Sequence, residues 1–553
     1  MKMPTVLWML RRIRRRIPAL AIMTLAHVFQ ALLGVAFALE TRQIIDCAVA
    51  GNGDGLCSAI LGQAAVIGGI LLCMTVYRHL RDRLRADLDR DWKKELLHGL
   101  LRGDYAAVSS YHTGELLNRM NNDVRIVDDG ILHVIPNVTA MLARLIASMS
   151  LLVALEPGFA FAVLAAGFLV VAVTAFMRSR LKDLTKRVSQ QDGKISGLLQ
   201  EVFEKLLVIQ GMDVAEETER RADALLNDRY ETQRKRKNVS LCANTGVSIL
   251  SYGAGFFALL WCSTELLQGR ISFGSLTAVT QLVSQLQAPF VGLSGVIPQY
   301  IAMIASGERL RELEAIQGQE EPEGEDPKSL YARMDSLCGN QICFSYDRDA
   351  VLQNASFAIK KGTFTAVTGP SGIGKSTLLK LLLGIFTPES GELYAFCDDE
   401  RISLDRSTRR LFAYAPQGNL LFSGTLRENL LITNPGASEE LIAQALWVSA
   451  MEDFVHQLPK GLDTLLGENG VGLSEGQLQR LSIARAVVSG APILLLDECT
   501  SALDAETERK VLQRLKELPG RTILAVTHRT AAVELCDCCL NMSEGVIVDK
   551  QYF

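Results

Sequence analysis

The pattern of apolar and polar positions divides the chain into two halves. In the first half, apolar runs alternate with charged stretches, and the runs reach the length of about 20 residues that an α-helix needs to cross a bilayer. From Gln341 onward, short apolar runs alternate with amphipathic segments, which is the pattern of strands alternating with helices. The sequence therefore predicts a multidomain membrane protein in which an all-α transmembrane domain precedes an α/β domain.

Six apolar runs predict six membrane-spanning helices. Most lysines and arginines of this half fall in two long charged segments, residues 78–94 and 178–237, whereas the short loops at the other ends of the helices contain almost none. Because basic residues accumulate on the cytoplasmic side, we expect both termini and both charged segments in the cytoplasm, and the protein in the cytoplasmic membrane. The six runs are residues 18–40, 58–77, 131–155, 157–177, 243–267 and 273–304.

Composition agrees with this division. Hydrophobic residues make up 48% of the chain and the mean hydropathy is +0.18, which is high for a soluble enzyme. The net charge of −4 gives no basic excess, so we expect no nucleic-acid partner. The twelve cysteines lack a paired metal-ligand spacing, and the cluster of Cys536, Cys538 and Cys539 is expected to pack in a core. Cys47 and Cys57 flank the first outer loop, where either a disulfide or two free thiols fits the sequence.

Several polar residues fall inside the apolar runs. An ionisable group at membrane depth usually faces the interior of a helix bundle or a water-filled path. A polar substrate cavity and hydrogen bonds between helices both explain such residues, and the sequence leaves the two open. Arg144 favours a functional role, and with His27 it points to an anionic group on a substrate that stays unidentified. The residues are His27, Gln30, Arg144, Asn244, Gln281 and Gln285.

The N-terminus combines apolar and basic residues. Leu7-Trp-Met-Leu10 is followed by five arginines within six positions. A mixed segment of this kind is typical of a helix that lies on a membrane surface, so membrane lipid is a predicted partner. The arginines are Arg11, Arg12, Arg14, Arg15 and Arg16.

An acidic stretch rich in glycine and proline follows the last apolar run, at residues 317–327. This composition is typical of a solvated linker and marks the domain boundary. We expect a transmembrane domain over residues 1–316, a linker over 317–335 and a nucleotide-binding domain over 336–553.

The nucleotide-binding prediction depends on the segment Gly-Pro-Ser-Gly-Ile-Gly-Lys-Ser-Thr at residues 369–377. It lies between an apolar run predicted to be a strand and a leucine-rich run predicted to be a helix, which is the context of a phosphate-binding loop. Its glycines let backbone N–H groups approach phosphate oxygens, Lys375 can reach the β- and γ-phosphates, and the Ser376 hydroxyl can ligate Mg²⁺. The predicted nucleotide-binding residues of this loop are Gly369, Ser371, Gly372, Gly374, Lys375, Ser376 and Thr377.

A second apolar run, residues 493–496, ends in the two carboxylates Asp497 and Glu498. After a phosphate-binding loop, a carboxylate at such a strand end holds Mg²⁺ directly or through water, which is the role predicted for Asp497. Glu498 is then placed to polarise the attacking water. The metal site is therefore expected to comprise Ser376 and Asp497.

These motifs resemble those of an ABC transporter half-unit of the exporter type, and the resemblance covers nearly the whole chain. Its most specific element is Leu473-Ser-Glu-Gly-Gln477, which is similar to the signature sequence of the family. The resemblance implies a six-helix transmembrane domain fused to an ABC ATPase domain, with ATP and Mg²⁺ as cofactors. One departure is Glu475, which stands where the family usually has glycine, and we expect its carboxylate to point away from the γ-phosphate.

The resemblance also implies roles for residues outside the phosphate-binding loop. Tyr346 would stack on adenine, Gln417 would sense Mg²⁺ and join the catalytic and metal sites, and His528 would contact the γ-phosphate and join Glu498 in catalysis. Ser501-Ala-Leu-Asp504 would cross between two ATP sites, and Glu468 would contact a loop of the membrane domain. These roles follow from the family's pattern rather than from the residue types alone.

Half-units of this family pair head to tail, which implies a second half-transporter as partner. ATP bound by one chain would be capped by the signature residues Ser474, Gly476 and Gln477 of the other. The segment 104–111, before Gly114 and Arg119, matches the position of the first cytoplasmic coupling helix. Residues 210–215 match the position of the second.

The predicted function is ATP-driven transport across the membrane by an exporter or flippase that works as a dimer. Two alternatives of the same class stay open: one subunit of a heterodimeric transporter, and an importer built on the exporter fold. A soluble ABC ATPase or an ATP-gated regulator belongs to another class, and six fused spans with a complete hydrolytic set argue against both.

Overall fold

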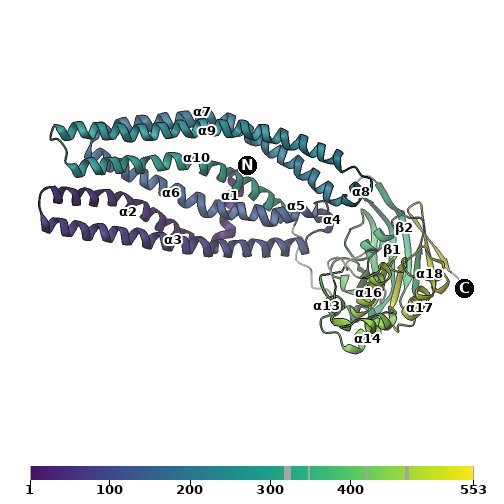
Figure 1. Ribbon diagram of the computed structural model, residues 1–553. Helices are drawn as coiled ribbons and strands as arrows, with labels where there is room; N and C mark the ends of the chain where they lie inside the picture. Colours follow the sequence, from purple (N-terminus) through teal and green to yellow (C-terminus); the bar gives the residue numbers. More distant parts are fainter. Residues whose placement is uncertain (1, 317–324, 347–348, 419–420, 467–472, 552–553) are drawn as a thin grey trace. The chain divides into compact units, whose positions relative to one another are not determined.

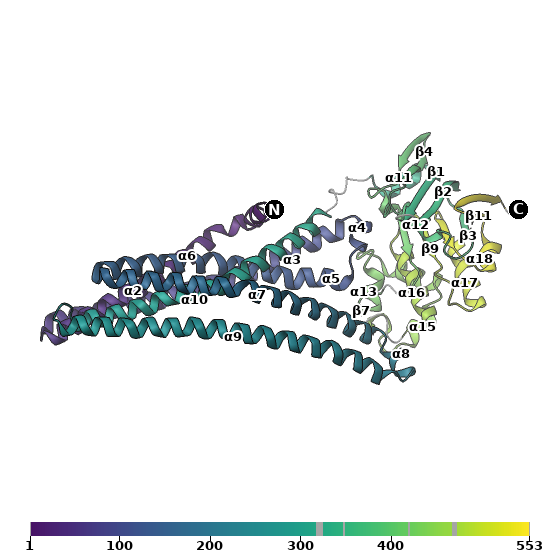
Figure 2. The same ribbon diagram turned by 90° about the horizontal axis from the view of Figure 1, so that it is seen from above.

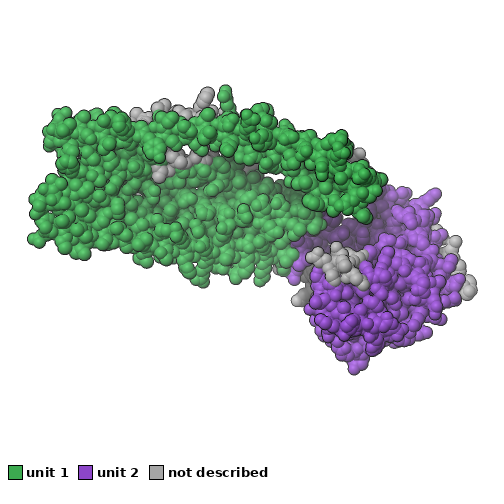
Figure 3. Space-filling model, in the orientation of Figure 1, with its two compact units in different colours: residues 1–98, 112–315 green, residues 99–111, 316–553 purple. Residues whose placement is uncertain are grey.

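A computed structural model of the chain describes residues 2–316, 325–346, 349–418, 421–466 and 473–551. The chain forms two compact units, shown in different colours in Figure 3. The first contains residues 1–98 and 112–315, and its described part consists of helices joined by short turns. The second contains residues 99–111 and 316–553 and combines helices with sheets. The predicted fold class, helical domain first and α/β domain second, is confirmed.

Each of the six predicted spans lies inside one long helix of the first unit. Four segments of the described chain are apolar and long enough to cross a membrane by length and composition: Thr5–Val49, Gly53–Arg102, Thr113–Leu155 and Ala215–Leu267. The long helices are α2 (Ile17–Val49), α3 (Gly53–Arg102), α6 (Val124–Leu155), α7 (Pro157–Glu204), α9 (Ala215–Leu267) and α10 (Phe273–Ala315). The short elements are α1 (Lys2–Arg12), the 3₁₀ turn η1 (Ile13–Arg16), α5 (Thr113–Asn118), the π-helical turn η2 (Arg119–Asp123) and α8 (Leu206–Gly211).

The long helices pack as a bundle (Figures 1 and 2). Helices α6 and α10 contact each other along much of their length, α2 lies against both, and α7 runs beside α9. Near the ends of α6 and α9, Leu152, Phe159 and Cys262 share one buried apolar cluster. Other large apolar side chains of α2 and α9, such as Leu25 and Tyr252, are exposed, as expected of helix surfaces that face lipid.

The second unit contains a six-stranded sheet and a four-stranded sheet. The six-stranded sheet has the order β12-β11-β3-β10-β9-β6, and its strands are parallel except for the antiparallel edge strand β12. Its strands are β3 (Phe364–Thr368), β6 (Phe412–Ala415), β9 (Ile493–Asp497), β10 (Thr522–Val526), β11 (Cys538–Ser543) and β12 (Val546–Gln551). The antiparallel sheet has the order β2-β1-β4-β5, with β1 (Met334–Tyr346), β2 (Asp349–Lys360), β4 (Ser390–Cys397) and β5 (Glu400–Ser403). A small pair joins β7 (Gly424–Thr425) to β8 (Leu465–Leu466).

Strands β9 and β10 are buried on both faces, as expected for the centre of a parallel sheet covered by other layers. Along β9, Leu494 and Leu496 join the core that contains α14 and α16, whereas Ile493 and Leu495 join the core that contains α12 and the antiparallel sheet. The helices are α4 (Tyr105–Ser109), α11 (Pro327–Arg333), α12 (Lys375–Leu382), α13 (Leu426–Leu431), α14 (Glu439–Val448), α15 (Glu452–Gln457), α16 (Glu475–Val488), α17 (Ala505–Lys516) and α18 (Thr530–Leu535), with 3₁₀ turns η3 (Arg409–Leu411) and η4 (Gly461–Asp463).

The predicted linker of residues 317–335 is too long. Asp326 caps the start of α11 by accepting a hydrogen bond from the backbone N–H of Ser329, and Pro327 takes the first helical position, where a missing N–H costs nothing. Leu330 and Tyr331 are buried in the core of the second unit, and the Tyr331 hydroxyl lies 2.9 Å from Thr522 Oγ1. The acidic stretch before α11 led to the prediction of a longer linker, because two buried apolar residues form no pattern in the sequence.

The cysteines are all unbridged among the described residues. Cys47 and Cys57 are free, so the possible disulfide at the first outer loop is absent. Cys536, just before β11, and Cys539, within β11, are both buried, and Cys539 belongs to an apolar core cluster. Core packing therefore accounts for this group.

Candidate functional site

The phosphate-binding loop connects β3 to α12, as the sequence predicts. Gly369 has φ +144° and Gly374 has φ +105°, in the region that side-chain-bearing residues avoid. A Cβ at Gly369 would lie 2.5 Å from Met542 O, and one at Gly374 would lie 2.3 Å from Val351 Cγ1. Only glycine fits at both positions, and the backbone can therefore curve closely around a bound group.

Lys375 is the first residue of α12 and its side chain points back to the loop. Its Nζ donates hydrogen bonds of 2.9 Å to both Gly369 O and Pro370 O, and it lies 2.8 Å from His528 Nε2. Burial lowers the pKa of Lys375, although the nearby carboxylates of Glu498 and Asp497 oppose this shift. The ammonium is thus held at the mouth of the loop, beside the strand end that carries His528.

Asp497 ends β9 and is almost fully buried. Its Oδ1 accepts a 2.9 Å hydrogen bond from Ser376 Oγ and its Oδ2 accepts a 2.9 Å bond from Tyr414 Oη. Burial raises the pKa of Asp497 despite these two bonds. A hydroxyl and a carboxylate side by side are hard oxygen donors of the kind that Mg²⁺ prefers, so the donor set fits that ion. Tyr414 was not predicted to be a site residue, although its position directly before Ala415-Pro-Gln417 could have indicated it.

Glu498 follows β9 in a left-handed backbone conformation, with φ +48°. This conformation costs about 1 kcal/mol or more for a residue with a side chain and is typical of functional sites. Its Oε2 accepts a 2.7 Å hydrogen bond from Gln417 Nε2, and its Oε1 lies 3.3 Å from His528 Nε2. The structure therefore brings together Gln417, Glu498, His528 and Lys375, as the sequence predicts.

Tyr346 ends β1 with its ring 40% exposed. Its hydroxyl lies 3.2 Å from Thr377 Oγ1, and its ring meets the edge of Phe386 at a centroid distance of 5.4 Å. Phe386 also contacts Tyr105 of α4, at 5.9 Å in a T-shaped geometry. The exposed ring beside the phosphate-binding loop is suited to stacking on a base. Phe386 and Tyr105 were missed, because their contact joins segments far apart in sequence.

The segment that contains α4 is bound to the second unit. Arg406 donates to the carbonyl oxygens of Arg102 at 2.7 Å and Gly103 at 3.0 Å, the last residues before α4. Asp104 caps α4 by accepting a bond from the N–H of Ala107. Residues 104–111, the predicted first coupling helix, thus share a compact unit with the nucleotide-binding residues.

The signature residues start α16. The Ser474 side chain accepts a bond from the N–H of Gln477, and the Gln477 side chain accepts a 2.8 Å bond from the N–H of Ser474, which together form a capping box. Glu475 is exposed at the first helical position. Within the described residues, no hydrogen bond connects Ser474, Gly476 or Gln477 to the cluster around Lys375. The structure does not bring these two groups of predicted residues together within one chain.

Gln479 joins the signature helix to the loop at residues 501–504. Its buried side chain donates a 2.9 Å bond to Ser501 Oγ and accepts a 2.9 Å bond from the N–H of Ala502. Gly476 approaches the same loop so closely that a Cβ would lie 3.1 Å from Ala502 O. Gln479 was missed because nothing in its local sequence distinguishes it from a solvated glutamine. Glu468 lies outside the described residues.

Arg529 holds the other end of this loop. It donates a 2.7 Å bond to Leu503 O and a 3.1 Å bond to Glu508, a buried carboxylate that also accepts a 2.9 Å bond from Thr500. Because Arg529 follows His528 directly, the loop and the strand end that carries His528 are mechanically connected.

Comparison with known proteins agrees with this geometry. Residues 20–290 match the family model of the ABC transporter transmembrane region, and residues 352–501 match a model described as ABC transporter. An ATP-dependent lipid A-core flippase of Photobacterium profundum is 30% identical over 397 residues, which are 70% of this chain and 67% of that protein. The chain belongs to the ABC transporters.

The similarity extends over most of this ABC transporter. An uncharacterized ABC transporter ATP-binding protein of Bacillus subtilis is 28% identical over 515 residues, 92% of this chain and 88% of that protein. The structure of a bacterial Atm1-family ABC exporter with ATP bound has the same fold, with a TM-score of 0.81 at 24% identity, and covers 97% of this chain and 94% of that one. Secretion and translocation ATP-binding proteins are longer relatives, and this chain spans less than half their length. The predicted family is confirmed: the chain is an exporter-type half-transporter that couples ATP hydrolysis to transport.

Some polar residues of the transmembrane domain take part in helix packing. Gln285 Nε2 donates a 2.6 Å bond to Gly34 O and so joins α10 to α2. His27 stacks on Tyr77 at a centroid distance of 4.5 Å, with its Nδ1 3.3 Å from Gln30 Oε1. These contacts favour helix packing for His27 and Gln30, whereas Gln285 also has a buried Oε1 without a hydrogen-bond partner among the described residues.

Two others have no such explanation, and one is exposed. The Oε1 atom of Gln281 is buried and has no hydrogen-bond partner among the described residues. Arg144 is half-buried, and no described carboxylate lies within ion-pair distance of it. Asn244 is exposed on α9. Arg144 and Gln281 stay candidates for contact with a substrate.

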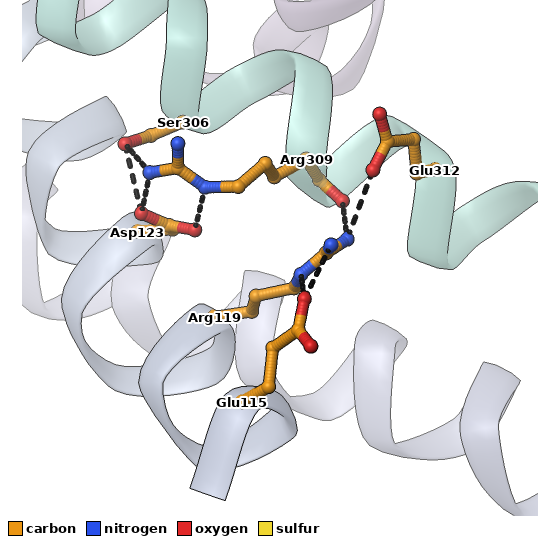
Figure 4. A network of polar contacts seen from close by, with 6 residues as sticks. All are labelled: Glu115, Arg119, Asp123, Ser306, Arg309 and Glu312. Atoms are coloured by element: carbon orange, nitrogen blue, oxygen red, sulfur yellow. Dashed lines mark hydrogen bonds and ion pairs between the residues drawn. The ribbon is translucent and has the colours of Figure 1, made fainter. Parts of the chain in front are cut away.

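Arg119, which the family pattern marks, lies in a polar network between η2 and α10 (Figure 4). Its buried guanidinium donates to Glu115 Oε1 at 2.7 Å, to Arg309 O at 2.9 Å and to Glu312 Oε2 at 3.1 Å. Most of these partners are half-buried or exposed, but the carbonyl bond fixes Arg119 directly to the backbone of α10.

A second ion pair in this network joins the half-exposed Arg309 to a buried carboxylate. The carboxylate of Asp123 has a side-chain exposure of 0% and accepts a 2.7 Å bond from Arg309 Nε and a 2.9 Å bond from Ser306 Oγ. Each element thus provides one arginine to the other, Arg119 from η2 and Arg309 from α10. This reciprocal pairing fixes the position of η2, which leads directly into α6.

Replacing Arg309 by methionine tests the pair with Asp123. The change leaves the buried Asp123 carboxylate without its cation, which is expected to lower the free energy of unfolding by about 1–3 kcal/mol, because the exposed half of Arg309 is screened by solvent. The measurement is thermal unfolding of the detergent-solubilised protein. Glu312→Gln, at an exposed partner, should change stability by less than about 1 kcal/mol. Equal midpoints for Arg309→Met and the parent protein would contradict a structural role for the pair.

Replacing Gln479 by leucine tests the connection between α16 and the 501–504 loop. The change leaves the N–H of Ala502 without its acceptor and frees the loop, at an expected cost of about 1–3 kcal/mol. We expect ATP turnover to fall while nucleotide affinity is retained, since no residue around Lys375 is touched. The matched control is Gln513→Leu on the exposed face of α17. A parallel loss in both variants would assign the effect to the leucine rather than to the lost bonds.

Proposed function

We propose that this chain is an exporter or flippase of the cytoplasmic membrane that works as a dimer, with each ATP bound between two chains. The observation that carries the proposal is the division of the site. Lys375, His528, Glu498 and Gln417 are joined by successive short contacts, but no hydrogen bond among the described residues connects them to Ser474 or Gly476 at the start of α16. A second subunit supplies the missing half. An unlike partner would satisfy the same geometry as a second copy.

The residues of the cluster divide the work of hydrolysis. Lys375 binds the β- and γ-phosphates, and Tyr346 stacks on adenine. Glu498 accepts a proton from the attacking water, and His528 donates a hydrogen bond to the γ-phosphate. Ser376, Asp497 and Gln417 would hold Mg²⁺, which neutralises the phosphate charge when it is bound. The Ser376–Asp497 bond keeps both donors facing one point before any ligand arrives.

Signature residues of the partner complete the site. The start of α16 presents Ser474 and backbone N–H groups, which are suited to phosphate oxygens. Because Glu475 is exposed and adjacent, its charge is screened by solvent and does not prevent such an approach. ATP then favours the closed pair, since both halves of the site exist only in that state.

Two segments transmit the closure of the paired nucleotide-binding domains to the transmembrane domain. Helix α4 is held by Arg406 and Phe386, close to the base-stacking Tyr346. At the junction of α8 and α9, Leu207 is 84% exposed and Met212 is 71% exposed, an apolar tip that suits docking on a second subunit. Residues 210–215 of this tip were predicted to be the second coupling helix.

Glu498→Gln tests the catalytic assignment. The amide keeps the side-chain size but cannot take a proton, so turnover is expected to fall by about 10²–10⁴-fold while ATP binding persists. Steady-state phosphate release and nucleotide binding are measured on the same sample. Glu517→Gln, an exposed glutamate of the same domain, should retain full turnover. Unchanged phosphate release in Glu498→Gln would remove Glu498 from the mechanism.

Native mass spectrometry of the purified chain with ATP tests the dimer. We expect a dimer in the Glu498→Gln background, weakened by Leu207→Glu because a charge would enter the apolar tip. The same substitution at Leu267, exposed at the other end of α9, should leave the dimer intact. A monomer with full ATP turnover would refute the divided site, and an inactive monomer would indicate an unlike partner.

A further inference from the structure

An arginine-lined cavity lies where the N-terminal segment turns into the first long helix. It has a volume of about 730 Å³ and is bounded by residues 11–16 and by one face of α3 between residues 88 and 95. Six of its lining residues are arginines, and only two, Asp91 and Glu95, are acids. The cavity is therefore strongly basic in a protein whose overall charge is negative.

Two of the arginines anchor the segment. Arg12 forms ion pairs with Glu95 of α3 and Glu314 of α10. Arg16 pairs with Asp87 at 2.9 Å and Asp91 at 3.1 Å, both on α3. Both acids of the cavity wall, Glu95 and Asp91, already form ion pairs, and Arg12 and Arg16 hold the turn in place.

Three other arginines have no such partner. Arg11, Arg14 and Arg15 are exposed, and no described carboxylate lies within ion-pair distance of them. Arg12 and Arg16 are fixed at either end of the four-residue turn η1, so they hold the neighbouring unpaired arginines in one region. No described side chain compensates their charge, and an anion would compensate it.

The apolar neighbours indicate which kind of anion. Leu7, Leu10 and Ile17 are 52%, 37% and 40% exposed beside these arginines, whereas Met9 and Ile13 are buried and fasten the segment to the bundle. The apolar run of α2 follows immediately. A free phosphate would gain nothing from exposed leucine and isoleucine, whereas a phospholipid presents phosphate and hydrocarbon together.

We propose that this cavity binds the headgroup of an anionic phospholipid. Arg11, Arg14 and Arg15 contact the phosphate, and Leu10 and Ile17 contact the upper part of the acyl chains. Guanidinium groups suit this contact because their planar donors match phosphate oxygens. The site is separate from the ATP site and from Arg144 and Gln281.

Lipid titration monitored by native mass spectrometry of the full-length protein in detergent tests the site. The probes are phosphatidylglycerol and phosphatidylcholine with identical acyl chains. We expect tighter binding of phosphatidylglycerol, weakened about fivefold for each arginine removed and about a hundredfold in the triple variant Arg11→Gln/Arg14→Gln/Arg15→Gln. The triple lysine variant, which keeps the charge, should retain most of the preference. If the triple glutamine variant fails to fold, Arg14→Gln alone should still show the fivefold loss.

The matched control replaces Lys235, Arg236 and Lys237, three consecutive basic residues of α9, by glutamine. If this control still prefers phosphatidylglycerol, the result supports the cavity as the binding site. An equal loss of affinity for phosphatidylglycerol would show general attraction to basic surfaces and overturn the proposal. Glycerol phosphate distinguishes the two sources of phosphate. Competition by it at the concentration of the lipid would overturn the lipid assignment in favour of a free anion. Equal binding of the two lipids by the parent protein would overturn the site itself.

Discussion

The register of the parallel strands determines the ATP site. Val526 of β10 pairs with Asp497 of β9 and with Val367 of β3, so the three strands end at the same level. Ala415 of β6 pairs with Leu496, which brings the following loop to that edge as well. A slip of one residue would move a loop by about 3.3 Å and reverse its side chains, more than the hydrogen bonds of the cluster tolerate. Apolar packing on both faces of the sheet prevents such a slip.

In the proposed dimer, this edge would provide only half of a closed site. The other half begins at α16 and is fastened to the 501–504 loop by Gln479, and Arg529 fastens that loop to the strand end next to His528. A displacement of α16 is therefore transmitted to the strand end at His528 through short, directional hydrogen bonds rather than through a flexible linker. In the proposed dimer, such connections would let binding at the interface change the geometry of the cluster around Glu498 in the same subunit.

Much of this arrangement was predictable, because it depends on local pattern. Long apolar runs predict the helices that carry the spans, and a glycine-rich loop between a strand and a helix predicts where Lys375 and Ser376 lie. Tyr414, Gln479 and Phe386 were not found, since their roles arise from contacts between distant segments. The short helix with Leu330 and Tyr331 was missed for another reason: two apolar residues form no periodic pattern, although their burial determines where the second unit begins.

The backbone of Glu498 has a consequence for the history of this position. At a φ of +48°, glycine would have less steric strain than glutamate, so Glu498→Gly would relieve backbone strain while removing the carboxylate. If Glu498 has the proposed catalytic role, backbone strain and ATP hydrolysis place opposite demands on this one residue. A lineage released from the need to hydrolyse ATP at this site would be expected to lose the glutamate, although the greater conformational entropy that glycine gives the unfolded chain would offset much of the strain relieved.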